Sequence, residues 1–276
     1  MLNLDRSRAR ASRTPVLRRG PLAGTDVARD NDSMIPDATD PFVTDPVLAR
    51  AVGYPYDITT YSFTLIDGVA APFDPNHRRD RRPVIGYGSN QSPIRLRQKY
   101  GTEHAPIPVQ RAWLADHDVV YSAHFASYGS LPAALRHVPG TRVAVAVNWL
   151  SDVELEVMHP TEVDNYHFAR LDDLTLELDG GEAIDVAWAY LSFRGHVGED
   201  TTPFALTEVA AENRQLTELS QLEVLTLMRN RLAPDDALDV FVRAHIDDQE
   251  IRATRARALE AAAVPVAHAI HKVERV

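Results

Sequence analysis

The chain has 276 residues and a formal charge of −10, with 45% hydrophobic and 25% charged residues. An acidic balance disfavours a nucleic-acid partner, because phosphate contacts need a basic surface. The sequence has no cysteine, which excludes disulfides, thiolate nucleophiles and cysteine-based zinc sites. No apolar run reaches the roughly 18 residues of a membrane-spanning helix, so we expect no membrane partner. The composition fits a cytoplasmic globular protein with additions at the ends of one main domain.

The first 33 residues differ in composition from the rest. They contain seven arginines and four acidic residues, a net charge of +3, which leaves −13 for the remainder. They lack the apolar segment of a secretory signal. We expect residues 1–33 to be a disordered tail, or to precede a true start at Met34.

Residues 34–81 are predicted to form a folded extension that packs on the main domain or covers its pocket. Residues 47–52 suit a short helix. Residues 61–66 suit a strand, which ends at an Asp-Gly turn, and a polar loop follows over 72–80.

An apolar strand that ends in an abrupt polar loop is the most informative segment. Residues 84–85 predict a buried strand, and Gly86 and Gly88 permit a tight turn or a close approach to a ligand. Ser92 is a good N-cap, and a proline at the first helical position favours a helix over 93–100. This arrangement points several backbone N–H groups into one small space, which suits an anionic group such as a carboxylate.

A second motif follows a predicted strand over 142–150. Ser151 and Glu154 have the spacing of a capping box at the start of a short helix. Apart from that role, Glu154 is expected to be an exposed acid. The chain then continues through His-Pro-Thr to Glu162, and Tyr166 lies four residues further on.

The remaining elements complete a main domain over 82–200. Residues 174–178 and 183–187 flank an Asp-Gly-Gly turn and predict a hairpin. A late strand over 185–191 contains Tyr190. We expect five or six strands between 82 and 194. From residue 203 onward the leucine spacing predicts helices, so 201–276 is expected to be a helical C-terminal extension.

The Tyr87-Gly88-Ser89-Asn90 loop after a strand, followed at the right interval by Glu162 and Tyr166, resembles the gamma-glutamylcyclotransferase-like family. The resemblance covers roughly residues 82–194. It implies an α+β fold built on a small mixed β-barrel of five to six strands with surrounding helices. The chain departs from the family pattern at His159, where an Asp is usual, and at Gln91, where an apolar residue is usual.

The resemblance also implies an activity and its residues. Glu162 would be the catalytic general acid and base, and its partial burial would raise its pKa. The substrate-binding residues would be Tyr87, Gly88, Ser89, Asn90, Gln91, Tyr166 and Tyr190. The partner would be a small gamma-glutamyl molecule, cyclised to 5-oxoproline without metal or cofactor. The released amine and the oligomeric state are left open.

Other interpretations of the same residues stay possible. The fold could bind a small molecule as a sensor or interaction module without catalysing a reaction. The protein could also catalyse the same cyclisation with a gamma-glutamylamine as substrate. His159, Glu162 and His167 could be read as a metal cluster, but their spacing differs from that of a zinc helix and Pro160 would break such a helix.

Overall fold

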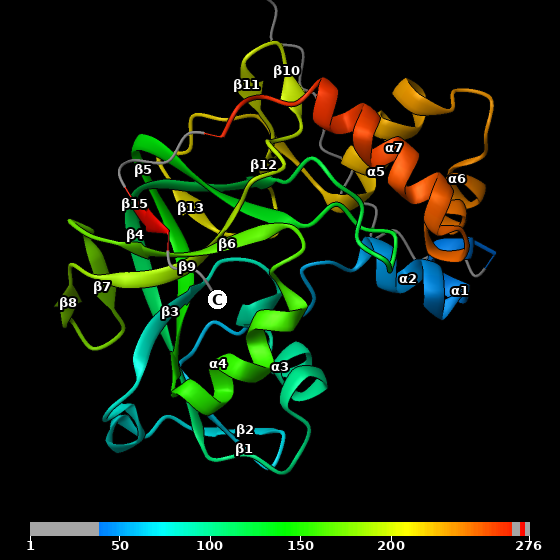
Figure 1. Ribbon diagram of the computed structural model, residues 1–276. Coiled ribbons are helices and arrows are strands. Elements are labelled where there is room, and N and C mark those ends of the chain that lie inside the picture. The colour runs from blue at the N-terminus through cyan, green and yellow to red at the C-terminus, as the bar shows by residue number, and fades with distance from the viewer. Residues whose placement is uncertain (1–38, 267–270, 274–276) are drawn as a thin grey trace, which may run out of the picture. The chain divides into compact units, whose positions relative to one another are not determined.

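The computed structural model describes residues 39–266 and 271–273. The predictions for residues 1–33 and for Met34 lie outside this range. The described chain is α+β, with one large sheet and helices on it (Figure 1). The helices are α1 (Pro41–Thr44), α2 (Pro46–Val52), α3 (Pro93–Tyr100), α4 (Asp152–Met158), α5 (Gln221–Leu232), α6 (Leu238–Asp247) and α7 (Gln249–Ala261), with short 3₁₀ turns η1 (Pro75–Arg78), η2 (Ser89–Gln91) and η3 (His159–Thr161). No helix in the described part of the chain is both long and apolar enough to cross a membrane.

The strands that form the centre of the sheet come from the predicted main domain. They are β3 (Arg82–Gly86), β4 (Ile107–Tyr121), β5 (Ala133–Leu150), β6 (Tyr166–Leu171) and β9 (Ala187–Ser192). The others are β1 (Phe63–Ile66), β2 (Val69–Pro72), β7 (Leu176–Leu178), β8 (Ala183–Ile184), β10 (Gly198–Glu199), β11 (Thr202–Pro203), β12 (Ala205–Leu206), β13 (Ala211–Glu212), β14 (Glu218–Leu219) and β15 (His271–Val273). The predicted hairpin is confirmed, because β7 and β8 pair antiparallel.

The sheet is open, so the expected closed barrel is wrong. Its main path runs β14-β12-β4-β5-β3-β9-β6-β15, and its two ends do not pair with each other. The reason lies in the long strand β4, whose free edge is divided among three partners. Its start pairs with β1, its middle with β7 and its end with β12. The sheet therefore branches along β4. Between residues 82 and 194 it contains seven strands, β3 to β9, where five or six were expected.

The strand β3 lies inside the sheet, which explains its apolar sequence. It pairs parallel with β9 and antiparallel with β5. Val84 and Ile85 are each 2% exposed, as predicted. A strand that is paired on both edges and buried favours apolar side chains, and in β3 the one charged residue, Arg82, stands at the half-buried start. The polar loop therefore begins where β3 ends.

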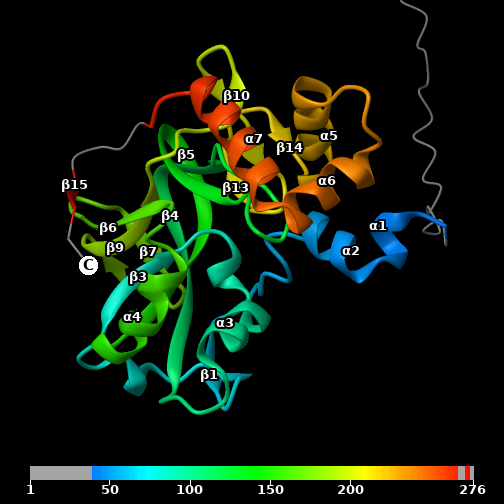
Figure 2. The same cartoon turned by 45° about the vertical axis from the view of Figure 1, so that its right-hand side comes forward.

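The region after residue 200 differs from the expected helical extension. Residues 202–219 form the short strands β11 to β14, and β12 joins the main sheet through Ala205 and Val120. The backbone of Phe204 forms hydrogen bonds with the backbones of Val197 and Tyr121, as in a paired strand and not as in a helix. The first helix after residue 200 begins only at Gln221, where Ser220 and Glu223 form a capping box. Figure 2 shows α5, α6 and α7 grouped together, with α2 beside α6.

Candidate active site

A cavity of about 560 Å³ collects most of the predicted site residues. Its walls include Tyr87, Gly88, Ser89, Asn90, Glu162, Tyr166 and Tyr190. Gln91 is the exception among the predicted residues. Its side chain is buried and accepts a hydrogen bond from Arg111 Nη1 at 2.6 Å. Gln91 thus holds the loop to β4 and does not line the cavity.

The loop after β3 is shaped by a tyrosine from the N-terminal segment. A Cβ at Gly88 would lie 2.5 Å from the Tyr54 hydroxyl and 2.8 Å from the Ala133 Cβ, so only glycine fits there. Tyr54 Oη accepts the Ala133 N–H at 2.9 Å, and Tyr54 itself lines the cavity. Through Tyr54, the described part of the predicted extension therefore contributes a wall of the pocket. Tyr128 stacks on Tyr54, with ring centroids 6.4 Å apart, and lines the cavity from the loop before β5.

Glu162 follows the turn η3 and is partly buried, with 15% of its side chain exposed. Three donors contact one of its oxygens, Oε1. They are the Asn90 amide at 3.3 Å, the Thr161 hydroxyl at 3.3 Å and the Lys99 ammonium. Among the described contacts Oε2 has no protein partner. Glu162 therefore joins the two predicted motifs through Asn90 and keeps one oxygen available.

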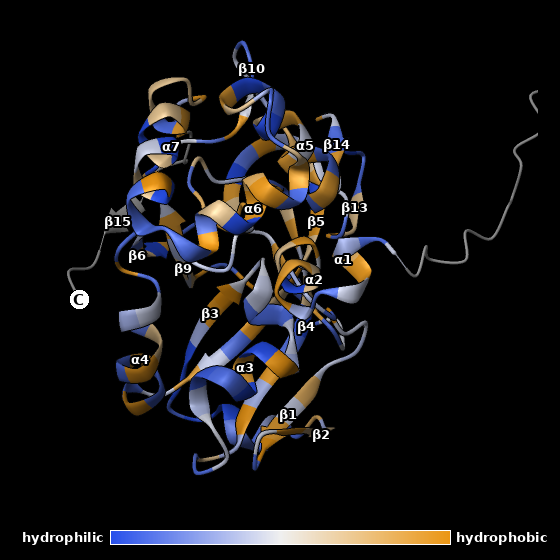
Figure 3. Cartoon of the chain, turned by 90° about the vertical axis from the view of Figure 1, so that its right-hand side faces the viewer, coloured by the Kyte–Doolittle hydropathy of each residue, from blue (hydrophilic) through white to orange (hydrophobic). Residues whose placement is uncertain are grey.

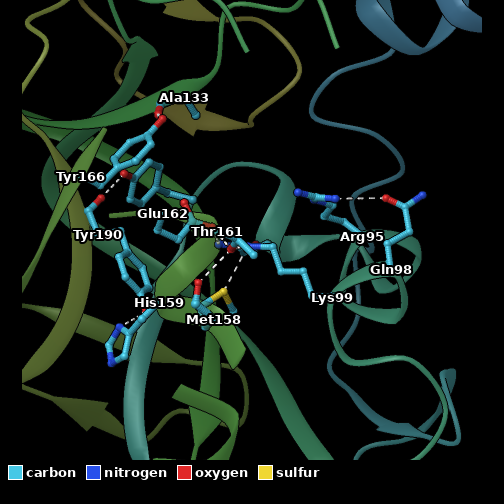
Figure 4. Close-up of polar contacts among 12 residues, drawn as sticks. Arg95, Gln98, Lys99, Ala133, Met158, His159, Thr161, Glu162, Tyr166 and Tyr190 are labelled. Atoms are coloured by element: carbon cyan, nitrogen blue, oxygen red, sulfur yellow. Dashed lines mark hydrogen bonds and ion pairs between the residues drawn. The ribbon is translucent and has the colours of Figure 1, made fainter. Parts of the chain in front are cut away.

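Lys99 was not predicted as a site residue. Its side chain reaches from α3, is 2% exposed, and donates to Thr161 Oγ1 at 2.8 Å as well as to Glu162 (Figure 4). Burial lowers the pKa of Lys99, and the Glu162 carboxylate opposes that shift. One signal was available in the sequence: of the 29 basic residues, only Lys99 and Lys272 are lysines.

The tyrosines of the cavity use their hydroxyls within the protein. Tyr87 donates to the Tyr190 carbonyl, and Tyr166 donates to the Ala133 carbonyl at 2.9 Å. The Tyr190 hydroxyl lies 2.8 Å from His159 Nδ1 (Figure 4). Burial raises the pKa of Tyr87 and of Tyr166, so both stay neutral. None of the three hydroxyls bonds to Glu162, so these residues shape the pocket without contacting its carboxylate.

The motif around Glu162 is built as predicted, with one correction. Ser151 donates its N–H to the Glu154 carboxylate at 2.8 Å, which confirms the capping box. Glu154 is not an exposed acid. Its side chain is 5% exposed and pairs with Arg81 at 3.1 Å. The segment before β3 brings Arg81 there, which local sequence spacing did not reveal.

A second group of site residues comes from far along the chain. Arg252 and Arg257 on α7 line the cavity, together with Arg95 on α3 and Arg194 after β9. Hydrophilic residues, coloured blue, are interspersed with apolar ones along α7 (Figure 3). Arg194 pairs with Glu260 at 3.4 Å. The other three form no ion pair within the described residues. No motif pointed to α7, because it begins 87 residues after Glu162.

The cavity thus combines hydrogen-bond donors and four arginines with three carboxylates, those of Glu162, Asp164 and Glu260. No group of three or more His, Asp or Glu side chains that could hold a metal ion occurs in residues 39–266 or 271–273. The arrangement suits proton transfer to and from a bound anionic molecule.

No family model matches the chain, and no curated protein matches it. The solved structures that resemble it include these two. The solution structure of At5g39720.1 from Arabidopsis thaliana has 16% sequence identity and a TM-score of 0.32, over 41% of this chain and 69% of that chain. A gamma-glutamyl cyclotransferase has 13% identity and a TM-score of 0.34, over 64% of this chain and 98% of that chain. At these values neither likeness assigns the chain to a family.

Proposed function

We propose that the protein is an enzyme that cyclises a gamma-glutamyl amide to 5-oxoproline, with Glu162 as general acid and base. One observation carries the proposal. Glu162 Oε1 accepts a hydrogen bond from Asn90 in the predicted loop, Oε2 has no protein partner within the described residues, and the residue lines the cavity. A carboxylate fixed on one side and available on the other suits proton transfer to a ligand held by the same loop.

The reaction needs no water. The alpha-ammonium group of the substrate loses one proton to Glu162 and attacks the gamma-carbonyl carbon as a neutral amine. The new C–N bond closes a five-membered lactam, the old amide C–N bond breaks, and the ring nitrogen gives up a second proton. The leaving nitrogen gains two protons, one of them returned by Glu162, and departs as an ammonium. Orientation of a tethered nucleophile can supply up to about 7–11 kcal/mol of the barrier. The main task of the site is therefore to fold the substrate and move protons between the two nitrogens.

The loop and the tyrosines would perform the folding. Asn90 and the N–H groups at the start of η2 would hold the alpha-carboxylate or the developing oxyanion. The rings of Tyr54 and Tyr128 would wall the substrate in. Lys99 would balance the charge of Glu162 while no substrate is bound, and the substrate ammonium would then approach Oε2.

The charge of the cavity bears on the leaving group. Arg95, Arg252 and Arg257 line it without an ion pair in the described part of a chain whose net charge is −10. Unpaired guanidinium groups favour carboxylates. We therefore favour a leaving group that is an amino acid or peptide over a simple amine.

The test measures 5-oxoproline release from gamma-glutamyl dipeptides, glutathione and gamma-glutamylamines. Wild type is compared with Glu162→Gln, and with Glu156→Gln as a matched control, because Glu156 is exposed on α4 and lies outside the cavity. We expect release by wild type and by the control, and none by Glu162→Gln. Ligand-induced melting shifts without release from any substrate would favour the binding module instead. Equal turnover by Glu162→Gln and wild type would show that Glu162 is not the general acid and base.

A further inference from the structure

A buried chain of hydrogen bonds ends at a histidine on the cavity wall. The Arg194 N–H donates to Ser192 Oγ at 3.2 Å. Ser192 Oγ lies 2.7 Å from Ser122 Oγ, which lies 2.9 Å from His124 Nδ1. Ser122 is 0% exposed, Ser192 2% and His124 6%, so all three side chains are buried. His124 lines the cavity, but neither motif of the sequence pointed to it.

The direction of this chain follows from its first member. A backbone N–H can only donate, so Ser192 Oγ accepts from Arg194. If Ser192 then donates to Ser122, and Ser122 to His124 Nδ1, every hydroxyl both accepts and donates. In the reverse direction the Ser192 hydrogen has no acceptor among the described contacts, and an unsatisfied buried donor is unfavourable. His124 Nδ1 is therefore an acceptor, and the ring hydrogen lies on Nε2.

The ring is also uncharged. Burial, and after it the nearby Arg194 guanidinium, lowers the pKa of His124 to about 3. The ring packs edge-on against Tyr166, with centroids 5.9 Å apart. Nε2 has no protein partner among the described contacts. A neutral donor is thus held in a fixed orientation on the wall of the cavity.

We propose that His124 is a ligand-binding residue that donates a hydrogen bond from Nε2 to a carboxylate oxygen of the bound molecule. As a donor, Nε2–H needs an acceptor on the ligand, and the wall adds three arginines that can only donate, Arg194, Arg252 and Arg257, beside the carboxylates of Asp164 and Glu260. The inference rests on the proposed function only for the choice of ligand. The direction of the hydrogen-bond chain and the tautomer do not depend on turnover.

The first experiment is nitrogen-15 NMR of the imidazole rings in the full-length protein without ligand. The His124 signals are assigned by their loss in His124→Gln. We expect the Nε2–H tautomer across neutral pH, and an added Nδ1–H fraction in Ser122→Ala, which removes the donor to Nδ1. A predominant Nδ1–H tautomer in wild type would overturn the inference whether or not the protein is an enzyme.

The second experiment measures the affinity for gamma-glutamylalanine by calorimetry, in the Glu162→Gln background so that no turnover occurs. We expect His124→Phe to weaken binding about tenfold or more, and His124→Gln to lose less, because its amide can donate near the position of Nε2. His167→Phe is the matched control, because His167 is exposed and outside the cavity. Equal affinity with and without His124→Phe, or no binding by either protein, would contradict the proposal. Absence of 5-oxoproline with binding and tautomer as expected would count against the proposed reaction alone.

Discussion

Lys99 and Asn90 contact the same oxygen of Glu162. Lys99 reaches it from the last turn of α3, and Asn90 reaches it from the turn η2 at 3.3 Å. Both belong to the segment that follows β3, so one stretch of chain fixes the carboxylate from two directions. The opposite oxygen is left without a protein partner in the described residues. One oxygen of Glu162 therefore serves the stability of the site, and the other is available for the proposed proton transfer.

We predict that Lys99→Met destabilises the protein by about 3–5 kcal/mol, because it leaves the Glu162 carboxylate partly buried without its counter-charge. Lys99→Met combined with Glu162→Gln should regain part of that loss, since no unpaired charge remains. Urea denaturation of wild type, both single variants and the double variant gives the coupling energy. Strictly additive effects would mean that the pair contributes nothing to stability.

A second buried pair should affect stability without affecting chemistry. Glu154 pairs with Arg81 and caps α4, and it lies outside the cavity. Glu154→Ala is expected to lower the free energy of unfolding by about 3–5 kcal/mol, whereas Glu156→Ala, on the exposed face, should change it by less than about 0.5 kcal/mol. The folded fraction of Glu154→Ala should keep wild-type turnover. A specific loss of turnover in well-folded protein would contradict this separation of roles.

The local parts of the site could be predicted from the sequence. The turn from β3 into α3 is fixed by neighbouring residues: apolar 84–85, glycines 86 and 88, and a Ser-Pro start at 92–93. The capping box at Ser151 is equally local. Such signals depend on backbone preferences within one turn, so they are readable without the fold.

The missing parts depend on contacts between distant segments. Arg81 with Glu154, Tyr54 with Gly88, and α7 at the cavity are set by tertiary packing that no short spacing encodes. The same holds for the open sheet. The strands β1, β3 and β9 were recognisable by their apolar runs, but the short strands β11 to β14 and the division of the β4 edge among β1, β7 and β12 were not.

Gly88→Ala should damage the pocket through Tyr54. The added Cβ would lie 2.5 Å from the Tyr54 hydroxyl, so Tyr54 or the loop must move. We expect a loss of about 1–3 kcal/mol in stability and a fall in 5-oxoproline release. Adding Tyr54→Phe removes the clashing oxygen and should restore part of the stability of Gly88→Ala. Tyr54→Phe alone also has a cost in stability. If adding Tyr54→Phe to Gly88→Ala lowers stability by that same amount, the clash with the hydroxyl is not the cause.

Stability should fall in mild acid because of His245. Burial, and after it the charges of Arg255 and Arg252, lowers the pKa of this histidine to about 3. The unfolded chain binds a proton below pH 6.5, whereas the folded chain does not until about pH 3. The contribution of neutral His245 to the free energy of unfolding is therefore fully present above pH 6.5. Below pH 6.5 it falls by about 1.4 kcal/mol per pH unit. Urea titrations at pH 6.5 and pH 5 measure this loss of stability. Between these two values His245→Gln should lose about 2 kcal/mol less of its free energy of unfolding than wild type does. Parallel losses in the two proteins would exclude His245 as the cause.

The arginines of the cavity should decide which leaving group is accepted. We predict that Arg252→Gln and Arg257→Gln each raise KM for gamma-glutamylalanine about tenfold, the effect of losing roughly 1.4 kcal/mol of binding. KM for gamma-glutamylethylamine, whose leaving group has no carboxylate, should change less than about twofold, because only the carboxylate of the leaving group uses these cations. Arg97→Gln is the matched control, since Arg97 is exposed on α3 and outside the cavity. An equal rise in KM for both substrates would place the arginines at the gamma-glutamyl carboxylate, which the two substrates share.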